Sequence, residues 1–141
     1  MATSSRALAA LALAAAAAGC GGGISAPRTH PVSGTVTYKG KAAAGVKVSF
    51  HPQFDMGAVN FVPSATTGQD GKFSLSTAAP NDGAPAGDYV VTFELLKAGT
   101  DKRGLDVEVD AWKGKYGDPA ASDKKVTVRS GDNALPPFVL D

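Results

Sequence analysis

The sequence predicts an all-β protein whose folded part is an antiparallel β-sandwich of about seven strands. Short runs of alternating apolar and polar residues recur along residues 32–141. Clusters of glycine, proline, aspartate and asparagine separate these runs, and no run in this part of the sequence has the apolar spacing of an amphipathic helix. Because successive side chains of a strand point to opposite faces, such runs bury one face and expose the other.

The first 19 residues form a segment that we expect to be removed from the mature protein. Arg6 precedes twelve consecutive apolar residues, Ala7 to Ala18. A helix of that length rises only about 18 Å, which is short of the ~30 Å core of a bilayer. The pattern therefore predicts a secretory signal peptide in residues 1–19.

The only cysteine of the chain, Cys20, follows this segment directly. Ala17-Ala18-Gly19-Cys20 resembles the bacterial lipobox, in which the cysteine is lipidated and begins the mature chain. The resemblance implies a lipid anchor on Cys20 that holds the protein outside the cytoplasm, in the cell envelope, at the outer membrane or cell surface. The alternative is a plain signal peptide cut near Ala18. Residues 20–31 contain a glycine run and prolines, which predicts a flexible linker after the anchor.

The predicted sandwich domain, residues 32–141, begins with two half-buried strands. Residues 32–38 alternate, and Gly34 falls on the apolar face, which predicts a close backbone approach or a bulge. Residues 46–50 alternate in the same way before Pro52. Residues 53–63 have apolar side chains without a clean period, and we expect a long loop or a short irregular strand there.

The middle of the chain carries turn signals. Asp70-Gly71 separates residues 64–67 from residues 72–76, which predicts a hairpin with Gly71 at positive φ. Residues 77–87 have loop composition.

The most regular strand pattern covers residues 89–96. Tyr89 begins its apolar face, and we expect its hydroxyl to bond upstream backbone as in a tyrosine corner. Residues 97–103 are predicted to form a polar turn and residues 105–109 a further alternating strand. Beyond them, we expect an ordered loop at 112–122 and strands near 126–128 and 138–140.

Several of these segments together resemble the carboxypeptidase regulatory-like (transthyretin-like) sandwich domains of bacterial surface lipoproteins. The resemblance covers most of residues 32–141 and implies a fold; its glycines and aromatic residues say little about chemistry. The segments are Val32-Ser33-Gly34-Thr35-Val36, Gly45-Val46-Lys47-Val48-Ser49-Phe50, Thr67-Gly68-Gln69-Asp70-Gly71-Lys72-Phe73-Ser74-Leu75 and Pro85-Ala86-Gly87-Asp88-Tyr89-Val90-Val91.

Charge and catalytic motifs restrict the function. The chain has 14 basic and 13 acidic residues, and loss of Arg6 with the leader would leave it neutral, so we expect no nucleic-acid partner. His30 and His51 lie far apart in sequence without a metal-ligand pattern, and no Gly-x-Ser-x-Gly motif occurs. We therefore expect a protein that is not an enzyme and uses no cofactor or metal.

Two clusters remain as candidate sites. Asp106, Glu108 and Asp110 would place three carboxylates on one strand face, either as a weak calcium site or, alternatively, as a solvated edge. Tyr38, Trp112 and Tyr116 could form a ligand-binding platform for sugar or peptide, although Trp112 could simply close one end of the sandwich.

The sequence thus favours a lipid-anchored, extracytoplasmic, non-catalytic domain that serves as a structural or interaction module. Its partners would be the membrane, through the lipid, and an envelope protein or glycan. The alternative is a carbohydrate- or peptide-binding domain that uses exposed aromatic residues or a sheet edge.

Overall fold

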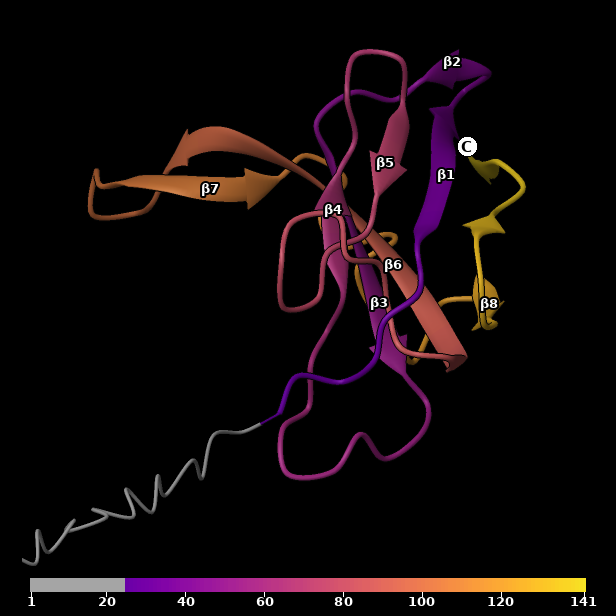
Figure 1. Ribbon diagram of the computed structural model, residues 1–141. Coiled ribbons are helices and arrows are strands. Elements are labelled where there is room, and N and C mark those ends of the chain that lie inside the picture. The colour runs from indigo at the N-terminus through magenta and orange to yellow at the C-terminus, as the bar shows by residue number, and fades with distance from the viewer. Residues whose placement is uncertain (1–24) are drawn as a thin grey trace, which may run out of the picture.

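The computed structural model describes residues 25–141, which form ten strands and no helix (Figure 1). The strands are β1 (Val32–Tyr38), β2 (Lys41–Ala42), β3 (Val46–Pro52), β4 (Ser64–Thr66), β5 (Lys72–Ser74), β6 (Gly87–Thr100), β7 (Asp106–Asp110), β8 (Lys125–Val128), β9 (Asn133–Ala134) and β10 (Phe138–Leu140). The structure has more strands than the predicted number of about seven. Two of the ten, β2 and β9, have only two residues each, which is too short to give an alternating pattern. Cys20 and the leader lie outside the described residues.

The strands form two five-stranded sheets, an arrangement consistent with a β-sandwich. In the first sheet, β1 pairs with β2, β5, β9 and β10. In the second, the order is β4-β3-β6-β7, with β8 also paired to β6. Within residues 25–141, no helix is long and apolar enough to span a membrane.

The first sheet is mixed, whereas the sequence predicted antiparallel pairing throughout. The chain leaves β8 in the second sheet and returns beside β1 in the same direction, so β9 and β10 both run parallel to β1. Pro136 and Pro137 separate these two short strands. Proline has no N–H to donate to the ladder, which explains why the returning segment pairs in two pieces.

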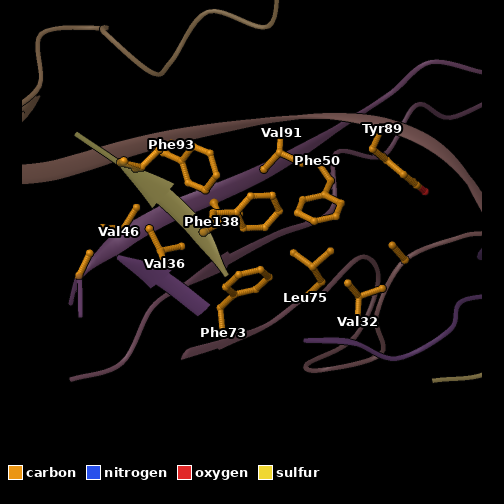
Figure 2. Packing of buried hydrophobic residues seen from close by; sticks show 14 of the residues in the cluster. Val32, Val36, Val46, Phe50, Phe73, Leu75, Tyr89, Val91, Phe93 and Phe138 are labelled. Atoms are coloured by element: carbon orange, nitrogen blue, oxygen red, sulfur yellow. The ribbon is translucent and has the colours of Figure 1, made fainter. Parts of the chain in front are cut away.

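The core lies between the sheets and contains the inward side chains that the alternation predicted (Figure 2). Phe50 of β3 and Phe73 of β5 meet across the two sheets with ring centroids 6.4 Å apart. Phe138 of β10 lies 6.2 Å from Phe73 and 5.2 Å from Phe93 of β6. Gly34 makes room for this packing, because a Cβ there would lie 2.7 Å from the Phe73 ring. The prediction at Gly34 was a close backbone approach or a bulge; the close neighbour is instead the side chain of Phe73.

The predicted tyrosine corner is confirmed at the start of β6. The Tyr89 hydroxyl donates a 2.7 Å hydrogen bond to the carbonyl oxygen of Pro85. Phe54, from the predicted loop 53–63, packs against Tyr89 at 5.4 Å, nearly perpendicular to it. A Cβ on Gly87 would lie 2.3 Å from the Phe54 ring, so glycine is required where the chain turns into β6.

The predicted hairpin around Asp70-Gly71 is wrong in its pairing. The tight turn is present, and Gly71 has a φ of 75°. However, β4 pairs with β3 and β5 pairs with β1, so the turn carries the chain from one sheet to the other. An isolated bridge joins Ser64 of β4 to Ser76, which lies two residues beyond the end of β5. Buried Thr67 directs this separation, since its hydroxyl donates to Ala43 and accepts from the N–H of Val46.

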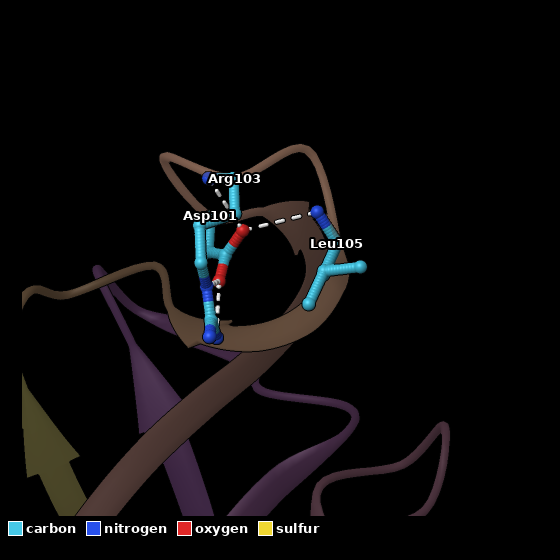
Figure 3. Close-up of polar contacts among 3 residues, drawn as sticks. All are labelled: Asp101, Arg103 and Leu105. Carbon is cyan, nitrogen blue, oxygen red and sulfur yellow. Dashed lines mark hydrogen bonds and ion pairs between the residues drawn. The ribbon is translucent and has the colours of Figure 1, made fainter.

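The second half of β6 and β7 form an arm that projects from the two sheets (Figure 1). Residues 97–100, predicted as a turn, continue β6, and the turn begins at Asp101. Its carboxylate accepts hydrogen bonds from the N–H groups of Arg103 and Leu105 and pairs with the Arg103 guanidinium (Figure 3). The predicted alternating strand is present as β7, but its valines are exposed, so the alternation there does not mark a buried face.

The pairing of the described chain starts before β1. His30, which the sequence places in the predicted linker, exchanges two backbone hydrogen bonds with Ala84. Gly83 allows this contact, because a Cβ there would overlap the carbonyl of His30.

Candidate functional site

The three aromatic residues proposed as a platform come together in the structure. The Trp112 ring lies 5.1 Å from the Tyr38 ring at 46°, and 5.1 Å from the Tyr116 ring at 84°. Offset and edge-to-face arrangements of this kind are favourable because the ring edges and faces carry opposite partial charge. Residues far apart in sequence thus form one continuous cluster, which we call the aromatic cluster.

The aromatic cluster is held at one end of the sheets by regular pairing. Tyr38 is the last residue of β1 and pairs with Leu140 of β10 and Lys41 of β2. Trp112 follows β7 in a turn whose first residue, Ala111, donates its N–H to the carbonyl of Leu95. The Trp112 backbone is therefore tied to the middle of β6.

Asp110 organises this turn with its carboxylate. It accepts hydrogen bonds from the N–H groups of Leu95, Trp112 and Gly114 at 3.0, 3.0 and 2.8 Å. Burial alone would raise the pKa of Asp110, but these N–H donors stabilise the charged form and leave the pKa below its ordinary value. The carboxylate acts as a cap for the turn, in the manner of an aspartate that closes a loop on its own backbone.

The same observation bears on the calcium alternative. Asp110 is directed to backbone donors, whereas Asp106 and Glu108 are exposed on the projecting β7. Among residues 25–141, no three histidine, cysteine, aspartate or glutamate side chains gather in a way that could hold a metal ion.

Tyr116 is positioned from both its backbone and its hydroxyl. Its carbonyl accepts the N–H of Phe93 at 2.9 Å, and its hydroxyl donates to the main-chain oxygen of Asp141. Lys115 donates to the same oxygen at 2.6 Å, and its ammonium lies 4.9 Å from the centre of the Tyr116 ring. These contacts fix the Tyr116 side of the cluster.

A hollow of about 500 Å³ opens beside Tyr38 and Trp112. The small side chains of residues 42–44 form one wall, and the exposed Lys39 and Lys41 also line it. The ammonium of Lys39 lies 5.3 Å from the centre of the Tyr38 ring. The volume of the hollow is in the range of small-molecule sites.

Two other hollows have a different character. One of about 670 Å³ lies over β1 and β5 and is lined mainly by serine, threonine and alanine. Another of about 390 Å³ lies on the Tyr116 side and mixes lysines with Asp118, Asp123 and Asp141. The hollow beside Trp112 therefore combines aromatic faces with positive charge alone.

The three rings are half-buried and pack against the core. Trp112 therefore does help to close one end of the sheets, as the plainer interpretation expected. The aromatic cluster still borders solvent, because Tyr38 and Trp112 line the hollow. One residue can perform both roles, since the inner part of an aromatic side chain packs while its outer part remains available.

The structure also pairs a histidine with a hydroxyl that the sequence did not bring together. His51 Nε2 lies 2.8 Å from Thr92 Oγ1, where β3 and β6 are neighbours. Thr92 is only 3% exposed, so its hydroxyl is not accessible to a substrate. Burial lowers the pKa of His51, and the Glu94 carboxylate partly opposes this. The geometry suits a structural hydrogen bond better than a nucleophile and base.

Sequence reasoning missed Lys39 and Lys41 as part of the site. Lysines flank many surface turns, so their residue type carries no signal without the neighbouring rings. The capping role of Asp110 was also missed, although an aspartate four residues before a glycine in a loop is a usable signal.

Comparisons with known proteins add little to this description. Neither the protein-family models nor the curated proteins searched match the sequence. Among solved structures, the chain is similar to part of a 9R-lipoxygenase from Cyanothece PCC8801, with 12% identity and a TM-score of 0.47. The match covers 83% of this chain and 17% of the lipoxygenase chain.

Proposed function

We propose that this protein is a non-catalytic binding module of the cell envelope, anchored by a lipid on Cys20, and that it binds its ligand at the aromatic cluster. The observation that carries the binding role is the convergence of Tyr38, Trp112 and Tyr116 in one cluster, two of whose rings, Tyr38 and Trp112, line an open hollow. Clusters of partly exposed aromatic side chains next to a concave surface are typical of ligand sites.

The carboxypeptidase regulatory-like fold is part of this proposal. Support comes from the glycines at Gly34, Gly71 and Gly87, each of which has a specific steric role, and from the tyrosine corner at Tyr89. In such a domain, two packed sheets form the scaffold and the loops at their ends carry the function.

The binding role is tested with the purified full-length protein on an array of saccharides and a panel of peptides. We expect a signal with the wild type that is lost in Trp112→Ala and retained in Trp112→Phe, which keeps an aromatic face. Circular dichroism must show that both variants are folded. A wild type that binds nothing, or a folded Trp112→Ala that binds as well as the wild type, contradicts the binding role.

The anchor is tested separately by detergent-phase partition. Wild-type protein from its native host is expected in the detergent phase, and Cys20→Ala in the aqueous phase. Inhibition of lipoprotein signal peptidase should leave a longer precursor. Equal partition of wild type and Cys20→Ala would remove the lipid from the proposal without touching the binding role.

A further inference from the structure

We propose that the hollow beside Tyr38 and Trp112 binds an acidic saccharide, with a pyranose ring against the aromatic faces and its carboxylate between Lys39 and Lys41. This inference rests on the proposed function and names the ligand class of the same site. It goes beyond that function because it predicts the charge and the chemical type of the ligand.

The charge of the hollow is the first argument. The side chains that line it include two lysines and no carboxylate. Both lysine side chains are exposed, and within residues 25–141 neither of them forms an ion pair with a carboxylate. An anionic group that enters the hollow therefore meets only attractive charge, whereas the hollow at Tyr116 would place it near three aspartates as well as two lysines.

The position of Lys39 is the second argument. Its ammonium lies 5.3 Å from the centre of the Tyr38 ring, within the distance of a cation–π contact. The contact places the charge over one of the two aromatic rings that line the hollow, so the ammonium lies within the hollow where the carboxylate would enter. Lys39 has a φ of 49°, in the left-handed region, and its N–H bonds the carbonyl of Leu140. The backbone that carries this lysine is thus firmly placed.

The dimensions favour a saccharide over a peptide. A volume of about 500 Å³ corresponds to a cube with an edge of about 8 Å, the length of only two to three extended residues. A compact pyranose ring fits this space, with its C–H groups against the negative face of an aromatic ring. The other lining residues include the short side chains of residues 42–44, which take up little of this space.

The experiment compares three probes on the full-length protein, purified in detergent. The probes are tetragalacturonic acid, the same oligomer with its carboxyls methyl-esterified, and a hexaglutamate peptide. Binding is measured by calorimetry and by the fluorescence of Trp112, the only tryptophan of the chain. We expect the acid to bind at least about tenfold more tightly than the ester, since charged hydrogen bonds add roughly that factor. Added salt should weaken the binding of the acid and leave the binding of the ester unchanged.

Variants connect the preference to the two lysines. The double variant Lys39→Gln with Lys41→Gln should bind the acid about tenfold more weakly than the wild type does. Its affinity for the ester should stay within about twofold of the wild-type value. A control variant with Lys72→Gln and Lys125→Gln, two exposed lysines outside the hollow, should bind all probes like the wild type. These substitutions change surface side chains, and thermal melts check that the fold is retained.

Three outcomes would overturn the inference. If acid and ester bind equally and Trp112→Ala abolishes both, the ligand is a neutral saccharide, and the proposed function stands alone. If hexaglutamate binds more tightly than the acid, the site recognises acidic peptide instead. If neither saccharide binds, the ligand class is wrong, while the wider array still decides the proposed function.

Discussion

The Tyr89 hydroxyl reaches back four residues to the carbonyl oxygen of Pro85 and forms a 2.7 Å hydrogen bond inside the protein. Tyr89 is 1% exposed, and burial raises its pKa above the ordinary value because a phenolate would be poorly solvated there. The bond closes the turn that leads from the long loop into β6. Since β6 pairs with β3, β7 and β8, this turn sets the position of most of the second sheet.

Tyr89→Phe removes this hydrogen bond and leaves the Pro85 carbonyl without it. We expect the free energy of unfolding to fall by about 1–2 kcal/mol. Urea denaturation measures the change. Tyr38→Phe, which removes a hydroxyl from a half-exposed ring, is the matched control and should cost less. Equal costs for the two variants would show that the Tyr89 hydrogen bond has no special role.

Gly71→Ala and Gly40→Ala form a second matched pair. Both glycines have positive φ, 75° and 76°, so both alanines incur a backbone cost of about 1–2 kcal/mol. A Cβ on Gly71 would also lie 2.6 Å from the Val36 carbonyl oxygen, which accepts a hydrogen bond from Ala43, whereas a Cβ on Gly40 meets open space. Gly71→Ala should therefore cost about 1–3 kcal/mol more. Thermal unfolding of both variants tests the difference.

These glycines illustrate what local sequence could predict. The alternation identified the inward residues of β3, and the Asp-Gly signal located a turn, because both depend on neighbours in sequence. The partner of each strand was not predictable in this way. β4 and β5 flank a tight turn and still join different sheets, since the hydrogen bonds of Thr67 and the pairing of Phe73 opposite Gly34 are long-range interactions.

The arm formed by β7 and the second half of β6 is another feature that local sequence could not predict. Residues 105–109 alternate as a half-buried strand would, yet nothing in the pattern says whether a second sheet covers the apolar face. The residues of the aromatic cluster were predicted from residue type alone. Their assembly depends on the pairing of β10 with β1 and on the cap at Asp110. The aromatic residues were identifiable from sequence; their lysine neighbours required the fold.

The arm should be the least protected paired region of the described chain. Val107 and Val109 are 36% and 44% exposed, so few buried apolar contacts hold β7 against β6. Local opening then costs less free energy than opening of the core. Hydrogen exchange followed by mass spectrometry should show faster exchange in residues 97–110 than in β3. Equal protection would indicate that the arm is stabilised by contacts beyond its own pairing.

Stability should decrease below about pH 6.5 because of His51. Burial lowers its pKa from the ordinary 6.5, so the unfolded chain binds this proton more tightly than the folded protein does. The contribution is complete above pH 6.5 and is lost as the pH falls towards the lower, folded-state pKa. His51→Gln keeps a polar partner for Thr92 but does not titrate. Its free energy of unfolding should change less between pH 7 and pH 5 than that of the wild type; parallel curves would contradict this.

Asp110→Asn tests the link between the cap and the binding surface. The neutral amide weakens the hydrogen bonds from Leu95, Trp112 and Gly114, and we expect a loss of about 1–2 kcal/mol. Because the pKa of Asp110 is lowered in the folded state, its contribution is complete above about pH 3.8 and is lost as the pH falls through the folded-state pKa.

Trp112 reports on this change directly, as the only tryptophan of the chain. Loosening of the turn should shift its fluorescence emission to longer wavelength in Asp110→Asn, before any global unfolding. Asp106→Asn, on the exposed part of β7, is the control and should leave both stability and emission unchanged. If the Asp110 variant is destabilised while its emission stays the same, the carboxylate supports β6 without positioning the tryptophan. An altered emission would instead connect the acidic end of β7 to the geometry of the aromatic cluster.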